Sequence, residues 1–477
     1  MIAGRRGRLP RRPAILISER RYMGVTDVIL DITGIGAELQ GVGRAADGRV
    51  VFVPFALPGE RIEADIVREA ERYMEGRLTR VIEPAPQRVA PLCPLYGRCG
   101  GCRAQHMSYQ RSLELKEQVV RQQLERIGGL TKPNVLPALG AEMPWRYRNK
   151  GEFFVSTDPA TRTPFVGVYA LGGNRLLPVD GCMIQSDIAM QAVKVVAQWM
   201  QIYCVPAWDA KPAPEGGVRF IVTRVNHVGE LMLILCTSGR RLKCLNQLFD
   251  MLNTQFPGRF RSLNHLSLAS RPTHALDGRI ESTQGKRVLY DQLMGLTFEM
   301  SPKTFFQVNH AQTEALYECV RRAAALTGNE LVVDAYCGCG TISLVLAREA
   351  KRVIGVEILE AAVENARLNA RRNKLADKTA FYAGDAGELV AGFLRQRERI
   401  DVLVVDPPRK GVDAGLLDAI IQVKVPRIVY VSCNPGTLAR DVKRLTQEGG
   451  YRMEYAQPVD MFAWTEHVES VVLITRA

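Results

Sequence analysis

The sequence contains no apolar run long enough to cross a membrane. Its start, residues 1–12, is rich in arginine, but the apolar stretch of a signal peptide does not follow. Internal repeats are absent, and so are low-complexity tracts beyond this basic start. These absences argue against a membrane-bound, secreted or repeat protein, so we expect a cytoplasmic protein without membrane contact.

The sequence also lacks the even cysteine count of a disulfide framework. Its eleven cysteines favour metal or thiol chemistry instead. A chain of 477 residues is too long for one ordinary core, so we expect two or three domains. The net charge of +13 fits either a protein that is merely basic or one that binds nucleic acid, and charge alone does not separate the two.

Composition and residue pattern divide the chain into four parts. Residues 1–21 form a basic tail that we expect to be disordered. Short strand-like runs with glycine turns fill residues 22–83 and predict a small β-barrel. A proline-rich linker opens a mixed central α+β domain, residues 84–300, and the last part is residues 301–477. In the first three parts we expect strands at 28–32, 50–53, 61–66, 219–225 and 230–236, and a helix at 108–127.

From residue 301 onward, strand-like and helix-like segments alternate. This alternation is typical of an α/β fold with a doubly wound, mainly parallel, Rossmann-like sheet. One clear helical segment is 361–372. The expected strands are 331–334, 352–356, 379–382, 401–405, 427–431 and 470–474.

The loop after the first of these strands predicts a nucleoside cofactor. Asp334 precedes the loop, and Gly338 and Gly340 allow its backbone to turn tightly beside a ligand. Glu357 ends the second strand, at the spacing where an acid binds ribose hydroxyls. The loop is not G-x-G-x-x-G, and S-adenosylmethionine, which has a ribose and no phosphates, fits it better than a dinucleotide.

Three later strands also end in polar loops. Asp385 follows the third strand and is either an acceptor for the adenine amino group or a helix cap. Asp406 opens a rigid Asp-Pro-Pro-Arg loop after the fourth, and Cys433 follows the fifth. Because the carboxyl ends of parallel strands meet at one edge of a sheet, we expect these loops to share one crevice.

Cys433 and Glu469 have the side chains needed to methylate a pyrimidine carbon. C5 of uracil is too weak a nucleophile to take a methyl group directly. A thiolate that adds at C6 makes C5 nucleophilic, and a base must then remove the C5 proton. Cys433 is the candidate nucleophile and Glu469 the candidate base. His467 is an alternative base, although a hydrogen-bonded structural histidine is the simpler interpretation.

Three cysteines, Cys93, Cys99 and Cys102, lie close together in a glycine-rich stretch. A metal site needs a fourth ligand, for which Cys182 is the best candidate. From spacing alone, zinc and a [4Fe-4S] cluster are equally good alternatives, and a metal-free group of thiols is a weaker third.

Together these motifs resemble the RNA uracil-5-methyltransferases, most closely the bacterial 23S ribosomal RNA branch. The resemblance covers nearly the whole chain. Its motifs are a TRAM-like barrel (Gly41 to Pro54, then Pro58-Gly59-Glu60), the cysteine pattern, Ser301 to Asn309, the cofactor loop, Asp-Pro-Pro-Arg, Ser-Cys-Asn-Pro and His-Val-Glu. Thr341 stands where the family often carries Asn.

The resemblance implies a class I methyltransferase fold and a role for each motif. It implies a [4Fe-4S] cluster on the four cysteines, RNA binding by the TRAM-like barrel, Cys433 as nucleophile and Glu469 as base. Contacts with S-adenosylmethionine are implied for Gln307, Tyr336, Glu357 and Asp406. Phe305 or Phe306 is a candidate for stacking on RNA bases, and Arg146, Arg148 and Lys150 for phosphate contacts.

The leading hypothesis is methylation of C5 of a uridine in 23S ribosomal RNA by a monomeric enzyme. Transfer RNA is the nearest alternative substrate. A cytosine-5 enzyme is disfavoured, because that RNA family carries a second cysteine in the proline loop, where this chain has Asp406-Pro407-Pro408-Arg409. A noncatalytic RNA-binding or redox-sensing protein is the alternative from a different class.

Overall fold

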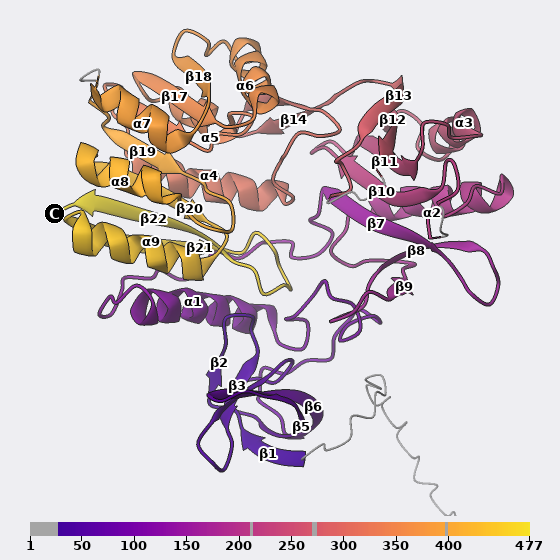
Figure 1. The fold of residues 1–477 in the computed structure, drawn as a ribbon, viewed down its shortest axis with the longest axis horizontal. Helices are drawn as coiled ribbons and strands as arrows, with labels where there is room; N and C mark the ends of the chain where they lie inside the picture. Colours follow the sequence, from indigo (N-terminus) through magenta and orange to yellow (C-terminus); the bar gives the residue numbers. More distant parts are fainter. Residues whose placement is uncertain (1–26, 210–212, 270–273, 396–398) are drawn as a thin grey trace, which may run out of the picture.

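The computed structural model describes residues 27–209, 213–269, 274–395 and 399–477. The predicted basic tail, residues 1–21, lies outside these ranges. Figure 1 shows an N-terminal barrel, a central domain and a C-terminal domain. In the described ranges, no helix is both long and apolar enough to span a membrane.

The N-terminal unit is a six-stranded sheet of short strands with the order β1-β5-β6-β4-β3-β2. Its core contains Leu30, Val51, Val53 and Ile62, which alternate with exposed residues as in a sheet with one buried face. Gly41 has no room for a side chain, since a Cβ there would lie 2.8 Å from Ala56. The strands are β1 Asp27–Asp31, β2 Gly34–Ile35, β3 Gly41–Arg44, β4 Val50–Val53, β5 Arg61–Glu69 and β6 Tyr73–Glu83.

The central domain holds a seven-stranded sheet with the order β13-β12-β11-β10-β7-β8-β9. Its middle strands β10 and β11 are almost entirely buried, which explains their continuous apolar sequence. The strands are β7 Lys150–Thr157, β8 Pro164–Tyr169, β9 Leu176–Pro178, β10 Val218–Val225, β11 Leu231–Ser238, β12 Phe260–Leu268 and β13 Arg279–Gly285. The helices are α2 Asp187–Ile202 and α3 Leu245–Gln255.

The C-terminal domain is the predicted doubly wound sheet, with the order β18-β17-β16-β19-β20-β22-β21. The first five strands in this order are parallel, and β22 runs antiparallel between β20 and β21. The strands are β16 Leu331–Ala335, β17 Arg352–Glu357, β18 Thr379–Ala383, β19 Val402–Val405, β20 Arg427–Ser432, β21 Tyr451–Val459 and β22 Glu469–Arg476. The helices are α4 His310–Ala324, α5 Thr341–Ala347, α6 Glu360–Arg372, α7 Ala386–Arg395, α8 Ala414–Val423 and α9 Pro435–Glu448.

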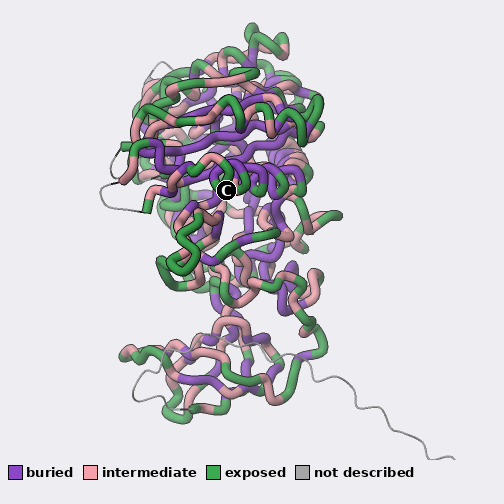
Figure 2. Tube along the Cα trace, turned by 90° about the vertical axis from the view of Figure 1, so that its right-hand side faces the viewer, coloured by how far each residue is buried: buried purple, intermediate pink, exposed green. Residues whose placement is uncertain are grey.

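Two elements from before residue 301 pack on the C-terminal domain. Helix α1 (Tyr109–Arg126), which begins after the capping residue Ser108, lies against α9 and β21. The hairpin of β14 (Leu289–Leu293) and β15 (Leu296–Met300) contacts α4, α5 and α6. Figure 1 shows α1 between the barrel and the C-terminal domain. In Figure 2 the buried residues, in purple, are concentrated inside the sheet domains.

Candidate active site

The nucleophile and base predicted from the sequence lie side by side at one edge of the C-terminal sheet. Cys433 directly follows β20, and Glu469 is the first residue of β22. These strands are antiparallel and pair Ser432 with Ser470, so Cys433 and Glu469 are the next pair in register. Asp406 follows β19, the other neighbour of β20, and completes the group.

Burial raises the pKa of all three groups, and neighbouring carboxyls add to the shift at Glu469 and at Cys433. Glu469 is 4 % exposed, and burial together with the nearby Asp406 carboxyl raises its pKa to about 8. Burial raises the pKa of Asp406 to about 7. Burial, Glu469 and Asp406 raise the pKa of Cys433 to about 11, while the cation of Arg409 acts in the opposite direction.

Arg409 links the loops around this group. Its guanidinium donates to Nε2 of His467 over 3.1 Å, so that ring nitrogen carries no proton. Burial lowers the pKa of His467, which keeps the imidazole neutral. The carbonyl of Arg409 accepts from the Asn434 side chain over 3.1 Å and so ties the proline loop to the cysteine loop. The bond to Arg409 fits the structural role that was the simpler interpretation of the sequence, and the role of His467 as an alternative base stays a prediction.

The cofactor loop follows β16 and is held by Glu357 from β17. The backbone nitrogen of Gly338 donates to Oε2 of Glu357 over 3.1 Å. Tyr336 has a left-handed backbone with φ +68°, and its hydroxyl donates to Asp413 over 3.2 Å. Asp385 accepts from the backbone nitrogen of Glu388 over 3.0 Å and so caps α7, while its contact with the adenine stays a prediction.

Residues 301–309 pass beside the cofactor loop and carry Gln307. The thiol of Cys339 donates to the carbonyl of Phe305. The Phe305 side chain is 74 % exposed, whereas Phe306 is 5 % exposed and packs in the core. Of the two candidates for base stacking, Phe306 is thus a core residue, with its ring beside Phe298, and stacking stays a prediction for Phe305.

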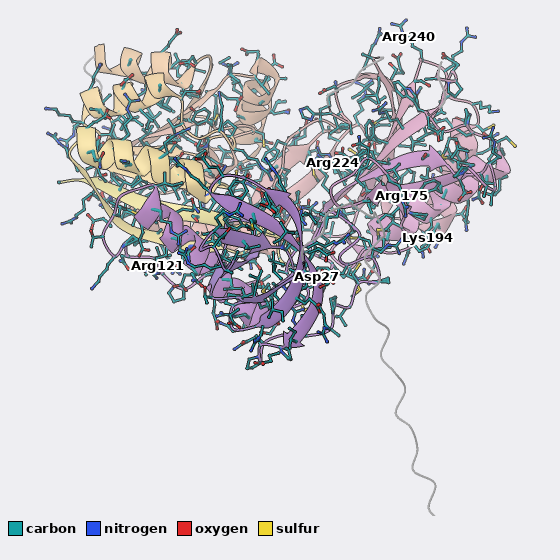
Figure 3. All side chains as sticks on the ribbon, turned by 60° about the horizontal axis from the view of Figure 1, so that its bottom comes forward. Asp27, Arg121, Arg175, Lys194, Arg224 and Arg240 are labelled. Carbon is teal, nitrogen blue, oxygen red and sulfur yellow. The ribbon has the colours of Figure 1, made fainter. Side chains whose placement is uncertain are left out.

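Arg224 of β10 is a buried guanidinium that the sequence analysis did not identify. It donates to the carbonyls of Pro302 and Thr304, over 3.2 and 2.6 Å, and so fastens the segment that holds Gln307 to the central sheet. Figure 3 shows Arg224 where the central and C-terminal domains meet.

The four predicted cysteine ligands lie in two parts of the central region, residues 93–102 and Cys182. Burial and neighbouring thiols, including that of Cys182, raise the pKa of Cys93, of Cys99 and of Cys102. Across the described ranges, no three His, Cys, Asp or Glu side chains form a group that could hold a metal ion. The described structure therefore does not show the four cysteines arranged around a metal ion.

A buried ion pair near Glu469 was also missed. Lys116 of α1 and Asp460, which follows β21, are both 0 % exposed, and Nζ lies 2.5 Å from Oδ1. Asp460 also accepts from the Tyr109 hydroxyl over 2.7 Å. One feature of the sequence could have identified Lys116. It lies at a spacing of four from Ser112 and Val120, on the face of the predicted helix that is buried. No sequence spacing identifies its partner, which lies 344 positions away.

Comparisons with known proteins point to one family. A family model described as tRNA (Uracil-5-)-methyltransferase matches residues 284–477, and a TRAM domain model matches residues 26–79. An uncharacterized RNA methyltransferase of Halalkalibacterium halodurans is 40 % identical over 447 residues, which are 94 % of this chain and 95 % of that protein. Another from Caldanaerobacter subterraneus is 41 % identical over 450 residues, 94 % of this chain and 97 % of that one.

A solved structure shares the whole architecture. The crystal structure of Pyrococcus abyssi tRNA (uracil-54, C5)-methyltransferase in complex with S-adenosyl-L-homocysteine superposes with a TM-score of 0.75 at 25 % identity, over 94 % of this chain and 100 % of that one. The chain has a class I methyltransferase fold preceded by a TRAM domain, and it belongs to the RNA (uracil-5-)-methyltransferase family.

Proposed function

We propose that this protein methylates C5 of a uridine in 23S ribosomal RNA through a transient covalent bond between Cys433 and C6 of the uracil. The observation that carries the proposal is the register of β20 and β22, which sets a thiol beside a buried carboxyl at the edge of the sheet where ligands bind. Bound S-adenosylmethionine supplies an electrophilic methyl group.

Cys433 acts first in this mechanism. Its thiolate adds to C6, and the electron pair of the C5=C6 bond moves toward O4, so that C5 becomes a nucleophile. Because burial and the neighbouring acids raise the pKa of Cys433, the thiol needs help to ionise. Arg409 lowers that pKa and is the charge that favours the thiolate.

Glu469 completes the reaction after C5 has gained its methyl group. Its carboxylate takes the C5 proton, the C5=C6 bond forms again, and the C6–S bond breaks to release Cys433. A pKa of about 8 suits a base that must both take and return a proton near neutral pH.

Four residues are proposed to hold the cofactor. Glu357 lies where ribose hydroxyls are bound in such folds, and Tyr336 is in the cofactor loop itself. Asp406 binds Ala335 at the start of that loop through its backbone nitrogen, and Gln307 is in the segment that Cys339 contacts. Asp385 is a weaker candidate, because its Oδ1 already caps α7.

The four cysteines are proposed to hold a [4Fe-4S] cluster. Such a cluster is larger than a single ion, so its thiolates stand further apart than those around zinc. Two features of the site fit sulfur ligands. The backbone nitrogen of Gly101 donates to Sγ of Cys99 over 3.3 Å, and Nε1 of Trp464 is buried without a hydrogen-bond partner in the described structure. Cys102 and Cys182 pack against the small cluster that contains Trp464.

Transfer RNA is the second candidate substrate. It is favoured by the structural similarity to the Pyrococcus abyssi enzyme over the whole chain, whereas the cysteine motif favours 23S ribosomal RNA. Mapping 5-methyluridine in both RNAs, from cells with and without the gene, distinguishes them. Loss of the base from transfer RNA alone would refute the ribosomal assignment.

Two substitutions test the mechanism. Cys433→Ala is expected to abolish methyl transfer while cofactor binding persists. Glu469→Gln is expected to trap a methylated RNA adduct that survives denaturation, because methylation precedes proton removal. The double variant should form no adduct, and Glu448→Gln on the exposed end of α9 serves as a matched control. Turnover by Cys433→Ala near the wild-type rate would remove the thiol from the mechanism.

A further inference from the structure

The segment that leads into Glu469 is held by many distant parts of the chain. We term residues 460–468, between β21 and β22, the base loop. Figure 1 shows this yellow loop reaching from the C-terminal sheet toward the segments that follow the barrel. Four consecutive carbonyls of the base loop accept hydrogen bonds from outside it. They are Met461 from Asn309 Nδ2 (3.1 Å), Phe462 from Lys116 Nζ (3.1 Å), Ala463 from Tyr147 Oη (3.0 Å), and Trp464 from the backbone nitrogens of Arg103 (2.9 Å) and Ala104 (3.0 Å).

The start of the base loop is fixed by charge as well. Asp460 accepts from both Lys116 and Tyr109, and the hydroxyl of Tyr109 accepts in turn from the backbone nitrogen of Ala141 over 2.7 Å. A buried ion pair is weak support for a role in stability, since apolar side chains of the same volume often stabilise equally well. The pair of Lys116 and Asp460 instead holds the backbone at the start of the base loop in one position.

The middle of the base loop has a conformation that these contacts must maintain. Trp464 has φ +68°, a left-handed backbone that costs a non-glycine residue on the order of 1–3 kcal/mol. Its ring stacks on Trp145 with the ring centres 4.4 Å apart. Its carbonyl is bound by two amides of the segment that also carries Cys99 and Cys102. The conformation therefore depends on groups outside the loop.

A mispositioned base has a specific kinetic consequence. Glu469 is the first residue after the base loop, whereas Cys433 follows β20 and is linked to that loop through Arg409, which binds both His467 and Asn434. Addition to C6 and methyl transfer need the thiol, but removal of the C5 proton needs the carboxylate within hydrogen-bond reach. A displacement of about 1 Å is enough to slow such a step about a hundredfold.

We propose that Lys116 and Tyr147, with the amides of Arg103 and Ala104, are positioning groups for proton abstraction, which hold the base loop so that Glu469 reaches the C5 proton. This inference rests on the proposed function. The step it controls transfers the C5 proton to Glu469 and returns the C6–S bonding pair to Cys433. The three anchors come from α1, from the strand-like approach to β7 and from the cysteine-rich segment.

Single-turnover assays with labelled S-adenosylmethionine and substrate RNA test the proposal, by following the methylated adduct and the released methylated RNA separately. Tyr147→Phe removes one hydroxyl and leaves the ring, so the protein is expected to fold. Its adduct should decay at least threefold more slowly than that of the wild type, while the adduct should form at an unchanged rate. Lys116→Met, which removes the charge at similar volume, should show a larger delay.

Tyr203→Phe, beyond the end of α2, is the matched control and should behave as wild type. Equal slowing of formation and decay in Tyr147→Phe, or unchanged decay, would overturn the positioning role. Failure of the proposed function gives a different result, because then Glu469→Gln would trap no adduct at all. If Lys116→Met does not fold, Tyr147→Phe alone decides the outcome.

Discussion

Burial raises the pKa of the Glu469 carboxyl well above that of an exposed glutamate. Its pKa in the folded protein is about 8, against an ordinary value of 4.5. Between these values the folded state binds more protons than the unfolded state, so the free energy of unfolding falls as the pH rises. Asp406, whose pKa is raised to about 7, acts in the same direction.

Glu469→Gln should therefore stabilise the protein at alkaline pH. The amide cannot ionise, so the variant avoids a penalty on the order of a few kcal/mol that the wild type incurs above pH 8. Thermal unfolding should give a higher midpoint for the variant at pH 9 and nearly equal midpoints at pH 5. Equal midpoints at both values would show that Glu469 is not held protonated.

Two adjacent phenylalanines allow a second test at the scale of single residues. Phe306→Ala should lower the free energy of unfolding by about 3–5 kcal/mol, because it leaves a cavity in the core. Phe305→Ala should change stability by less than about 0.5 kcal/mol. If Phe305 stacks on a base, the same change should weaken RNA binding by about 1–3 kcal/mol. Denaturant unfolding and filter binding of both variants check this, and unaltered binding by Phe305→Ala would exclude stacking.

Among residues, those with a distinctive chemical role were predictable and those that support them were not. Cys433 directly follows one strand, and Glu469 begins another. Both strands have long apolar runs in the sequence, so the proximity of the two residues could be predicted. Lys116 and Asp460 depend on a helix docking against a distant loop, which local pattern does not encode. Arg224 was missed for a related reason, since its partners are backbone carbonyls, which any sequence provides.

Among elements, the strands of the C-terminal sheet were predicted best. Parallel strands buried on both faces require continuous apolar sequence, and all six predicted strands are confirmed within two residues at each end. Strand β21 was not predicted, because it is only partly buried and contains Pro458. The predicted helix at 108–127 is confirmed as α1, but its packing against α9 depends on tertiary contacts that periodicity does not reveal.

The cysteine-rich segment is expected to bind iron. Protein purified without oxygen should contain about four iron atoms per chain, and Cys182→Ser should lose most of them. Cys204→Ser is the matched control, since Cys204 is exposed and lies outside the four-cysteine group. Iron analysis with visible absorption checks this, and one zinc per chain in place of iron would overturn the cluster assignment.

In the whole molecule, α1 connects the barrel to the C-terminal domain. Apolar residues of the barrel pack on one side of α1, where Leu57 and Ile35 share a cluster with Leu115 and Val119. Val120 and Leu124, on another side, belong to the core of the C-terminal domain. The barrel is thus placed relative to the catalytic edge by a helix rather than by a flexible linker. The sequence indicated the barrel and the linker but not this rigid connection.

The pairing of Lys116 with Asp460 also sets the order in which the protein is completed. A ribosome adds about 5–20 residues per second, so α1 waits roughly 20–70 s for the 344 residues that separate the pair. During that time the side of α1 that packs on the C-terminal domain, with Val120 and Leu124, has no partner, and exposed apolar surface of this kind is bound by chaperones.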